Sequence, residues 1–151
     1  MILVTGGLGY IGSFTLKLLS KNKAVSIDNL SRGNKFANKF CLNINTNIQN
    51  ENNLIKIVKK YKIKTVLHLA AYTCVRESKK NPKIYKKNNL INQKIFFEKI
   101  INLGIKRIVF ASSYSAQGYN SNKKEKFSPY AKYKYEIEKY LKKISKKNNV
   151  K

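Results

Sequence analysis

Short runs of apolar residues alternate along this chain with longer segments in which apolar residues recur every three or four positions. The apolar runs cover residues 2–4, 23–27, 39–44, 65–70 and 107–112. The segments with helical periodicity run from 10 to about 20, from 51 to 61, from 82 to 103 and from 129 to 147. Continuous apolar runs are typical of strands buried on both faces of a parallel sheet. The alternation therefore predicts an α/β fold with a doubly wound parallel sheet.

Three regularly spaced glycines follow the first apolar run. Gly6, Gly9 and Gly12 form the pattern G-x-x-G-x-x-G between the predicted first strand and first helix. In dinucleotide-binding turns the first glycine allows a tight turn, the second lets the backbone approach a pyrophosphate, and the third lets the helix pack closely. The helix that starts at Tyr10 would also direct its N-terminal amides and the positive end of its dipole toward the phosphates. We therefore expect a pyrophosphate-binding turn in a Rossmann-like sheet.

The second apolar run ends at Asp28, the only aspartate in the chain. It lies about 20 residues beyond the glycine turn, where a carboxylate accepts hydrogen bonds from an adenosine ribose. A carboxylate at this position favours NAD over NADP, because it repels the 2′-phosphate of NADP. Arg32 lies close enough in sequence to keep NADP as an alternative. Asp28 followed by Asn29 is also ordinary turn chemistry, so a purely structural role is the competing interpretation.

Side chains suited to proton transfer occur in the last third of the chain. Ser113 follows the predicted fifth strand, at the edge where open parallel sheets bind their ligands. Tyr130 and Lys134 are four residues apart near the start of the last predicted helix, so their side chains share a face. An ammonium beside a tyrosine favours the phenolate, which can act as a base. The same spacing recurs by chance at Tyr135 and Lys139, so the spacing alone is a weak signal.

Seven short motifs occur together in one order over essentially the whole chain. They are VTGGLGYIGS at 4–13, DNLS at 28–31, HLAA at 68–71, ES at 77–78, NN at 88–89, FASS at 110–113 and SPYAKYK at 128–134. With these motifs the chain resembles the N-terminal half of the UDP-glucose 4-epimerases, which belong to the NAD-dependent epimerase/dehydratase family of extended short-chain dehydrogenases/reductases. The resemblance implies an isomerase of nucleotide-sugar and galactose metabolism.

The resemblance also implies roles for individual residues. The catalytic residues would be Ser113, Tyr130 and Lys134. The residues in contact with NAD would be Gly6, Gly9, Tyr10, Ile11, Gly12, Asp28, Asn29, Ala70, Ala71, Asn89, Tyr130 and Lys134. Tyr130 would take the proton of the sugar 4-hydroxyl while hydride passes to NAD, and a 4-keto UDP-sugar would then receive the hydride on its other face. Related dehydratases and decarboxylases carry an acidic residue just after the position of Ser113, and its absence here favours epimerisation.

Length and composition exclude several classes of protein. A chain of 151 residues is long enough for one domain with its own core, and we expect a single NAD-binding domain over 1–151. No apolar stretch approaches about 20 residues, so we expect no membrane-spanning helix. The two cysteines are interpreted as reduced thiols, so we expect a cytoplasmic protein. Cys41 and Cys74 lack the spacing of metal ligands, and His68 is the only histidine, so we expect no metal site and a structural His68.

The formal net charge of +25 raises the possibility of nucleic-acid binding. The excess is nearly all lysine, and the lysines are scattered over every predicted helix. Arginine, which binds phosphates and base edges better, occurs only at Arg32, Arg76 and Arg107. We therefore expect non-specific, salt-sensitive binding to polyanions and no specific nucleic-acid site, with a basic polyanion-binding protein as an alternative.

The sequence stops at Lys151, after the helix that follows the fifth strand. By comparison with the family that it resembles, we expect this chain to lack the C-terminal domain that binds the sugar nucleotide. The residues that move protons would then be present without the substrate site. Two alternatives follow: a non-catalytic NAD-binding remnant, and one half of a split enzyme whose partner chain supplies the rest.

Overall fold

The computed structural model describes residues 1–19, 23–118 and 127–151, and these form two compact units. The first unit comprises Met1–Ala70, Glu98–Ala111 and Val150–Lys151. The second comprises Ala71–Phe97 and Ser112–Asn149. Within the described residues, no helix combines the length and the apolar character needed to cross a membrane.

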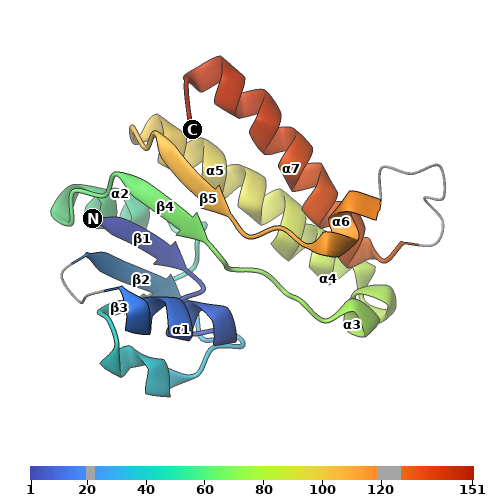
Figure 1. The fold of residues 1–151 in the computed structure, drawn as a ribbon, viewed down its shortest axis with the longest axis horizontal. Coiled ribbons are helices and arrows are strands. Elements are labelled where there is room, and N and C mark those ends of the chain that lie inside the picture. Colours follow the sequence, from blue (N-terminus) through green and yellow to red (C-terminus); the bar gives the residue numbers. More distant parts are fainter. Residues whose placement is uncertain (20–22, 119–126) are drawn as a thin grey trace. The chain divides into compact units, whose positions relative to one another are not determined.

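The first unit is built on a five-stranded parallel sheet (Figure 1). Its strands are β1 (Ile2–Thr5), β2 (Ala24–Asp28), β3 (Asn43–Asn45), β4 (Thr65–His68) and β5 (Arg107–Phe110). They lie side by side in the order β3-β2-β1-β4-β5. The chain leaves β1 for β2 on one side and later returns to place β4 on the other, so the strand order reverses beside β1. This confirms the predicted doubly wound sheet, whose ligands bind at such a reversal.

Register places the carboxyl ends of the inner strands together. Thr5, the last residue of β1, pairs with Ile27 of β2 and with His68 of β4. The turn that follows β1 and the end of β2 therefore lie at the same edge of the sheet. The inner strands β1, β2 and β4 are largely apolar, and residues such as Leu3, Val25 and Val66 are inaccessible to solvent because both faces of the sheet are covered there.

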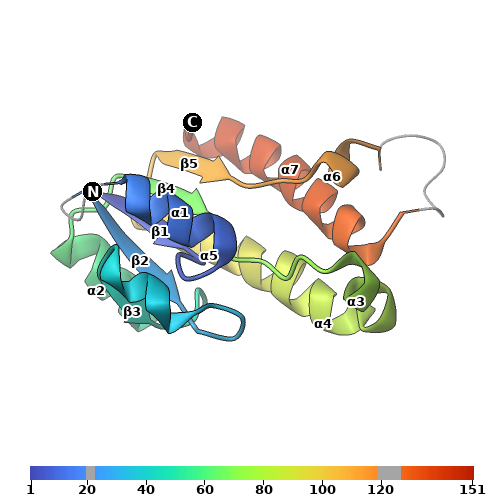
Figure 2. The same cartoon turned by 60° about the horizontal axis from the view of Figure 1, so that its bottom comes forward.

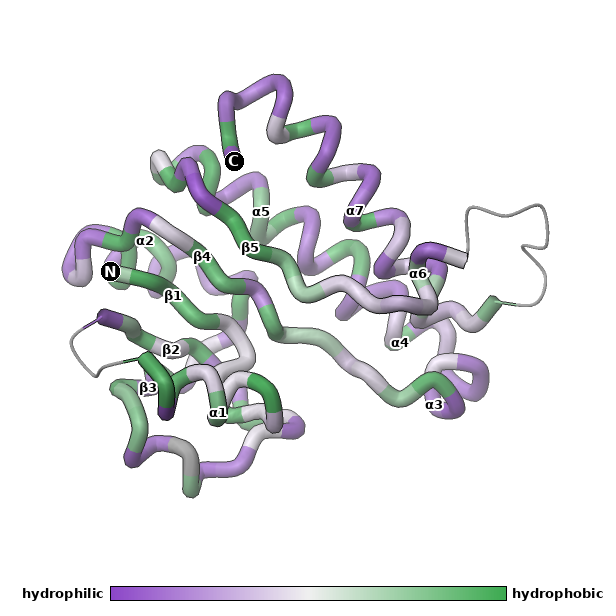
Figure 3. The backbone as a smooth tube through the Cα atoms, in the orientation of Figure 1, coloured by the Kyte–Doolittle hydropathy of each residue, from purple (hydrophilic) through white to green (hydrophobic). Residues whose placement is uncertain are grey.

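Two helices of the first unit cover opposite faces of this sheet (Figures 1 and 2). Helix α1 (Tyr10–Leu18) connects β1 to β2, and α2 (Glu51–Lys60) connects β3 to β4. Right-handed crossovers that run in opposite directions along a sheet put their helices on opposite faces. Leu16 of α1 and Leu54 of α2 are buried in the resulting core. The strands are largely hydrophobic, whereas α2 alternates between hydrophobic and hydrophilic positions (Figure 3).

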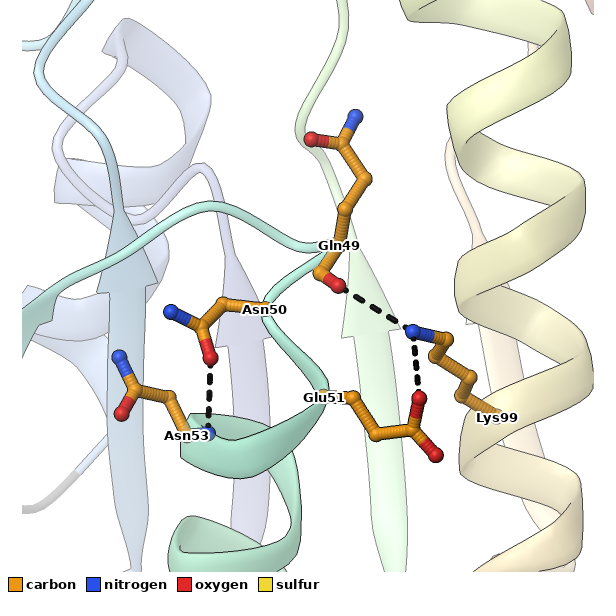
Figure 4. Close-up of polar contacts among 5 residues, drawn as sticks. All are labelled: Gln49, Asn50, Glu51, Asn53 and Lys99. Carbon is orange, nitrogen blue, oxygen red and sulfur yellow. Dashed lines mark hydrogen bonds and ion pairs between the residues drawn. The ribbon is translucent and has the colours of Figure 1, made fainter.

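Polar contacts hold the start of α2 (Figure 4). The side chain of Asn50 caps the helix by accepting a hydrogen bond from the backbone N–H of Asn53 at 3.0 Å. Lys99 belongs to α5 (Asn92–Asn102) and pairs with Glu51 at 2.9 Å. The Lys99 ammonium also donates to the backbone carbonyl of Gln49 at 3.3 Å. These contacts tie the N-terminus of α2 to the end of α5 within the first unit.

The second unit is helical. Its elements are α3 (Val75–Lys80), α4 (Pro82–Lys86), the π-helix η2 (Lys87–Ile91), the first half of α5, α6 (Tyr114–Gly118) and α7 (Pro129–Asn148). Helix α7 packs against α3, α4, η2 and α6. The core of the second unit contains Tyr85, Phe96 and Ile137, which are all inaccessible to solvent.

The structure corrects several predicted element boundaries. The predicted third strand at 39–44 is wrong for most of its length: η1 (Lys35–Lys39) is a 3-10 helix, and only Asn43–Asn45 pairs with β2. The apolar run is used instead to bury Cys41 against the sheet. The predicted helix over 82–103 is interrupted by η2, because a π-turn adds one residue that apolar periodicity does not reveal. Two short helices, α3 and α6, were not predicted, and Ser20 of the first predicted helix lies outside the described residues.

Candidate functional site

The glycine turn of the first unit joins β1 to α1, and two of its glycines are required by the protein itself. Gly6 has a φ of 71°, in the left-handed region, and a Cβ there would lie 2.8 Å from the backbone nitrogen and Cα of Ala70. A Cβ on Gly12 would overlap the carbonyl oxygen of Gly6 and lie 2.6 Å from the Cα of Gly7. Both positions therefore exclude any side chain, and α1 packs directly on the turn.

Gly9 differs from these two, because the protein places little demand on it. Its φ of −76° and ψ of 175° suit any residue, and a Cβ there would meet only the Gly6 carbonyl oxygen, at 3.3 Å. Gly9 precedes the first turn of α1, whose N–H groups have no intrahelical acceptor and receive no side-chain cap from Gly9. The turn thus leaves open space beside Gly9, next to backbone N–H groups of α1 that have no acceptor within the helix. An open face with free backbone donors could hold a pyrophosphate.

Gly7 is a structural requirement that the spacing pattern did not identify. A Cβ there would overlap the Oγ of Ser26 and lie 2.8 Å from Cδ1 of Leu16. The turn therefore passes between β2 and α1 with no room for a side chain. The only signal in the sequence is the Gly6-Gly7 pair itself, which does not say which neighbours it must clear.

The carboxylate of Asp28 bridges two loops at the carboxyl end of the sheet. Its Oδ2 accepts a hydrogen bond from the backbone N–H of Leu8 at 3.1 Å, and its Oδ1 accepts one from Leu30 at 2.8 Å. Asn29 is held by its own contacts, donating to Asn47 at 2.7 Å. A carboxylate offers about four acceptor positions, so these two bonds leave capacity for ribose hydroxyls. The geometry accommodates both the structural and the ribose-binding interpretation of Asp28.

A pocket of about 430 Å³ adjoins the glycine turn within the first unit. Its lining includes Gly9, Tyr10, Phe14, Lys17, Arg32 and Phe36. The walls are mainly apolar, and the two cationic side chains give the pocket a positive charge. Arg32 therefore lies on the same surface as the turn, where its positive charge could interact with the 2′-phosphate of NADP. The NADP alternative stays open for this reason.

His68 at the end of β4 has structural contacts. It is inaccessible to solvent, its Nδ1 shares a hydrogen bond with Thr5 Oγ1 at 2.8 Å, and its ring stacks on Phe110 at 6.1 Å between centroids. Thr5 Oγ1 also accepts a hydrogen bond from the backbone of Ala70 at 3.3 Å. These contacts fix the path of the chain at Ala70, against which Gly6 turns.

Tyr130 lies in the second unit, in the first turn of α7. The helix begins with Pro129, and the Ser128 side chain caps it by accepting from the N–H of Ala131 at 3.2 Å. The backbone N–H of Tyr130 donates to Ser78 Oγ of α3 at 3.3 Å. Tyr130 is 9% exposed, so its ring is held by packing as well. Ser78 belongs to the ES motif at 77–78, but its supporting role toward Tyr130 was not predicted from the sequence.

Lys134 lies one turn beyond Tyr130 and is only 3% exposed. Burial lowers its pKa from 10.5 to about 8, and the negative charge of Glu138 opposes that change. At neutral pH the side chain is therefore mostly an ammonium beside Tyr130 on the same helix face. Ser113 precedes α6, and its hydroxyl shares a hydrogen bond with Ser115 at 2.9 Å.

Asn89 is buried, and its amide group clamps the backbone of Tyr72. Its Oδ1 accepts from the Tyr72 N–H at 2.9 Å, and its Nδ2 donates to the Tyr72 carbonyl at 2.7 Å. Asn88 donates to the same Oδ1 at 2.9 Å. The amide is thus committed to holding the segment that follows Ala71, which is a positioning role.

The predicted site residues fall into two groups. The first unit brings together those around the glycine turn at the carboxyl edge of the sheet: Gly6, Gly9, Tyr10, Ile11, Gly12, Asp28, Asn29 and Ala70. The second unit contains the remainder: Ala71, Asn89, Ser113, Tyr130 and Lys134.

Sequence comparison relates this chain to known proteins. A sequence model described as "NAD dependent epimerase/dehydratase family" matches residues 2–151. The UDP-glucose 4-epimerase GEPI48 of Cyamopsis tetragonoloba is 38% identical over 130 residues, covering 78% of this chain and 37% of its own. The UDP-glucose 4-epimerase of Rhizobium meliloti (strain 1021) is 33% identical over 150 residues, covering 93% of this chain and 46% of its own.

Solved structures share the fold as well. The Thermotoga maritima UDP-glucose 4-epimerase with UDP-glucose superposes with a TM-score of 0.85 at 32% identity, over 99% of this chain and 52% of that one. The Brucella ovis UDP-glucose 4-epimerase in complex with NAD superposes with a TM-score of 0.88 at 28% identity, over 99% and 49%. The chain thus spans half or less of the length of most of these relatives. The match over residues 2–151 places it in the NAD dependent epimerase/dehydratase family.

Proposed function

We propose that this chain supplies the NAD-binding and proton-transferring residues of a UDP-sugar 4-epimerase. The observation that carries the proposal is the open face at Gly9, where neither the backbone conformation nor the protein neighbours require glycine. Glycine is favoured at a helix N-cap, but other residues serve there equally well, and a ligand that approaches the backbone closely adds a reason for glycine. A pyrophosphate at a helix N-terminus is such a ligand.

The residues around the turn fit NAD. First-turn N–H groups of α1 would bind the pyrophosphate, and the free acceptor positions of Asp28 would take the ribose hydroxyls. Bound at the turn, NAD would supply a reversible acceptor for the hydride of the sugar carbon. The protein's own contribution at this end is to bind and orient the cofactor.

The proton-transferring residues belong to the second unit. Tyr130 would take the proton of the sugar 4-hydroxyl through its phenolic oxygen and return it after the hydride transfer. Lys134 would favour the phenolate form of Tyr130, because a buried ammonium near a phenol stabilises the negative oxygen. Ser113 would hold the substrate oxygen with its hydroxyl. UDP-glucose and UDP-galactose are the proposed substrate pair.

For these 151 residues taken by themselves, cofactor binding without turnover is the second candidate. Both solved epimerases named above are about twice as long as the part that this chain matches. Binding energy from remote parts of a substrate orients its reacting carbon, and a displacement of about 1 Å costs roughly 100-fold in rate. We therefore expect no turnover of UDP-sugars by these 151 residues by themselves.

Calorimetric titration with NADH and NADPH tests the cofactor proposal. We expect NADH to bind more tightly than NADPH, and Asp28→Asn to reduce that preference while keeping an acceptor for Leu8 and Leu30. Glu51→Gln removes the same charge elsewhere in the first unit and serves as the control. Failure of both cofactors to bind at millimolar concentration, or a preference for NADPH, contradicts the proposal.

A coupled assay of UDP-galactose epimerisation with added NAD tests the catalytic residues. The 151 residues are assayed by themselves and mixed with the separately expressed C-terminal half of a full-length relative. We expect turnover only in the mixture, and Tyr130→Phe should lower it by about 10²–10⁴-fold. Tyr135→Phe, at the chance copy of the spacing, is the matched control and should retain activity. Turnover that survives Tyr130→Phe refutes the assignment.

A further inference from the structure

Glu138 lies one helical turn beyond Lys134 on α7, and its carboxylate is already engaged. Its Oε1 accepts a short hydrogen bond from the hydroxyl of Ser112. Ser112 is the residue immediately before the candidate catalytic Ser113. One carboxylate therefore contacts the segment that carries Ser113 and lies one turn from Lys134, both within the second unit.

The spacing along α7 puts three functional groups in one row. Tyr130, Lys134 and Glu138 follow one another at intervals of four residues, so neighbours in the row are about 5–6 Å apart at Cβ. Lys134 is the most buried of the charged side chains in the described residues, and Glu138 is half-buried. An ammonium so deeply buried needs a compensating negative charge to stay protonated.

From α5, the ammonium of Lys94 lies over the Tyr140 ring of α7, 5.4 Å from the ring centroid. Among α3, α4, η2 and α6 only α3 carries an acid, Glu77, and its Oε2 accepts a hydrogen bond from the Tyr85 hydroxyl at 2.9 Å. The ring of Tyr114 on α6 is exposed. The remaining charges on these helices are exposed cations: Arg76, Lys79, Lys80, Lys83, Lys86 and Lys87.

We propose that Glu138 is a positioning residue that uses its bond to Ser112 to keep its carboxylate beside Lys134, so that Lys134 remains an ammonium next to Tyr130. The proposal deepens the proposed function, because the charge on Lys134 matters for the proton transfer by Tyr130. The same carboxylate anchors the segment that presents the Ser113 hydroxyl. Glu138 touches no substrate or cofactor in this account and acts through Lys134.

The direct measurement is the protonation of Lys134 in the free protein, without cofactor or substrate. Lysine labelled with ¹³C at Cε is incorporated, and NMR follows the Cε resonances with pH; Lys134→Arg identifies the resonance of Lys134 by its loss. The parent should titrate at about 8. In Glu138→Gln the midpoint should fall by about one pH unit, a tenfold loss of proton affinity.

Glu136→Gln is the matched control. Glu136 lies on the same helix and pairs with the exposed Lys132 at 4.0 Å, also four residues apart. Its loss should leave the Lys134 midpoint unchanged. Ser112→Ala, at an exposed position, releases Glu138 without removing its charge and should lower the midpoint by a smaller amount.

An unchanged Lys134 midpoint in Glu138→Gln overturns the proposal. If Glu138→Gln fails to fold, the Lys134 midpoint is measured in Ser112→Ala instead. A midpoint in Ser112→Ala equal to that of the parent refutes the proposal. Neither measurement uses NAD or a UDP-sugar. Absence of NADH binding would therefore refute the proposed function without bearing on Glu138, and the two failures are distinguishable.

Discussion

Replacing Gly9 by alanine separates the two demands that act on the glycine turn, folding and cofactor binding. The backbone of Gly9 is extended, and the new methyl group would meet only the Gly6 carbonyl oxygen at 3.3 Å, which a movement of a few tenths of an ångström relieves. Alanine caps a helix less well than glycine but restricts the unfolded chain, so the free energy of unfolding should change by less than about 1 kcal/mol.

The effect of the same substitution on the cofactor should be much larger. The methyl group would occupy the open face of the turn, where we place the pyrophosphate. We expect the affinity for NADH to fall at least about tenfold, which corresponds to about 1.4 kcal/mol. Gly9→Ala should therefore yield a folded protein that binds its cofactor poorly.

Gly12→Ala is the contrasting variant on the same turn. Its methyl group would overlap the Gly6 carbonyl oxygen and come within 2.6 Å of the Gly7 Cα, and backbone atoms cannot move aside as a flexible side chain does. Overpacking of this kind typically costs about 1–3 kcal/mol and can cost more. We expect Gly12→Ala to lower the free energy of unfolding of the protein in the absence of any cofactor.

Urea unfolding followed by circular dichroism measures the stabilities, and calorimetric titration with NADH measures the affinities. A folded Gly9→Ala protein with parental NADH affinity would refute the placement of the pyrophosphate at the turn. Parental stability in Gly12→Ala would show that the packing of α1 on the turn is looser than the distances indicate.

Three further predictions concern charge. The pKa of Lys134 is 10.5 in the unfolded state and about 8 in the folded state, so the free energy of unfolding of the parent should rise by up to roughly 3 kcal/mol between pH 8 and 10.5. Urea unfolding at pH 7 and 10 measures this rise, and Lys134→Met should lack it. Glu51→Gln should cost less than about 1 kcal/mol by breaking an exposed pair with Lys99, with a cost that shrinks in high salt; a salt-independent loss would contradict this. Binding to short DNA duplexes should ignore sequence and fall steeply between about 50 and 200 mM salt, and a sequence-specific complex stable at the higher concentration would favour a nucleic-acid function.

The sequence by itself determined the features that depend on local patterns. Four of the five strands and the long helices α2 and α7 follow from apolar runs and helical periodicity, because burial of a face imposes a period on the chain. The glycine turn and Asp28 were found by spacing, since a single helix and a single strand, α1 and β2, separate them along the chain. The third strand was misplaced because its apolar run buries Cys41 in an irregular segment, and an apolar run does not reveal which residues join the ladder.

Tertiary structure decided everything that depends on residues far apart in the chain. Gly7 is required by Ser26, which comes from another strand. The amide of Asn89 hydrogen-bonds the backbone of Tyr72 from a π-helix. The apolar periodicity of the sequence does not reveal the extra residue of that π-helix. Glu138 receives the hydroxyl of Ser112 across 26 residues of sequence. A local pattern records which side chains share a face of one element, whereas contacts between elements exist only once the chain has folded and fixed which faces meet.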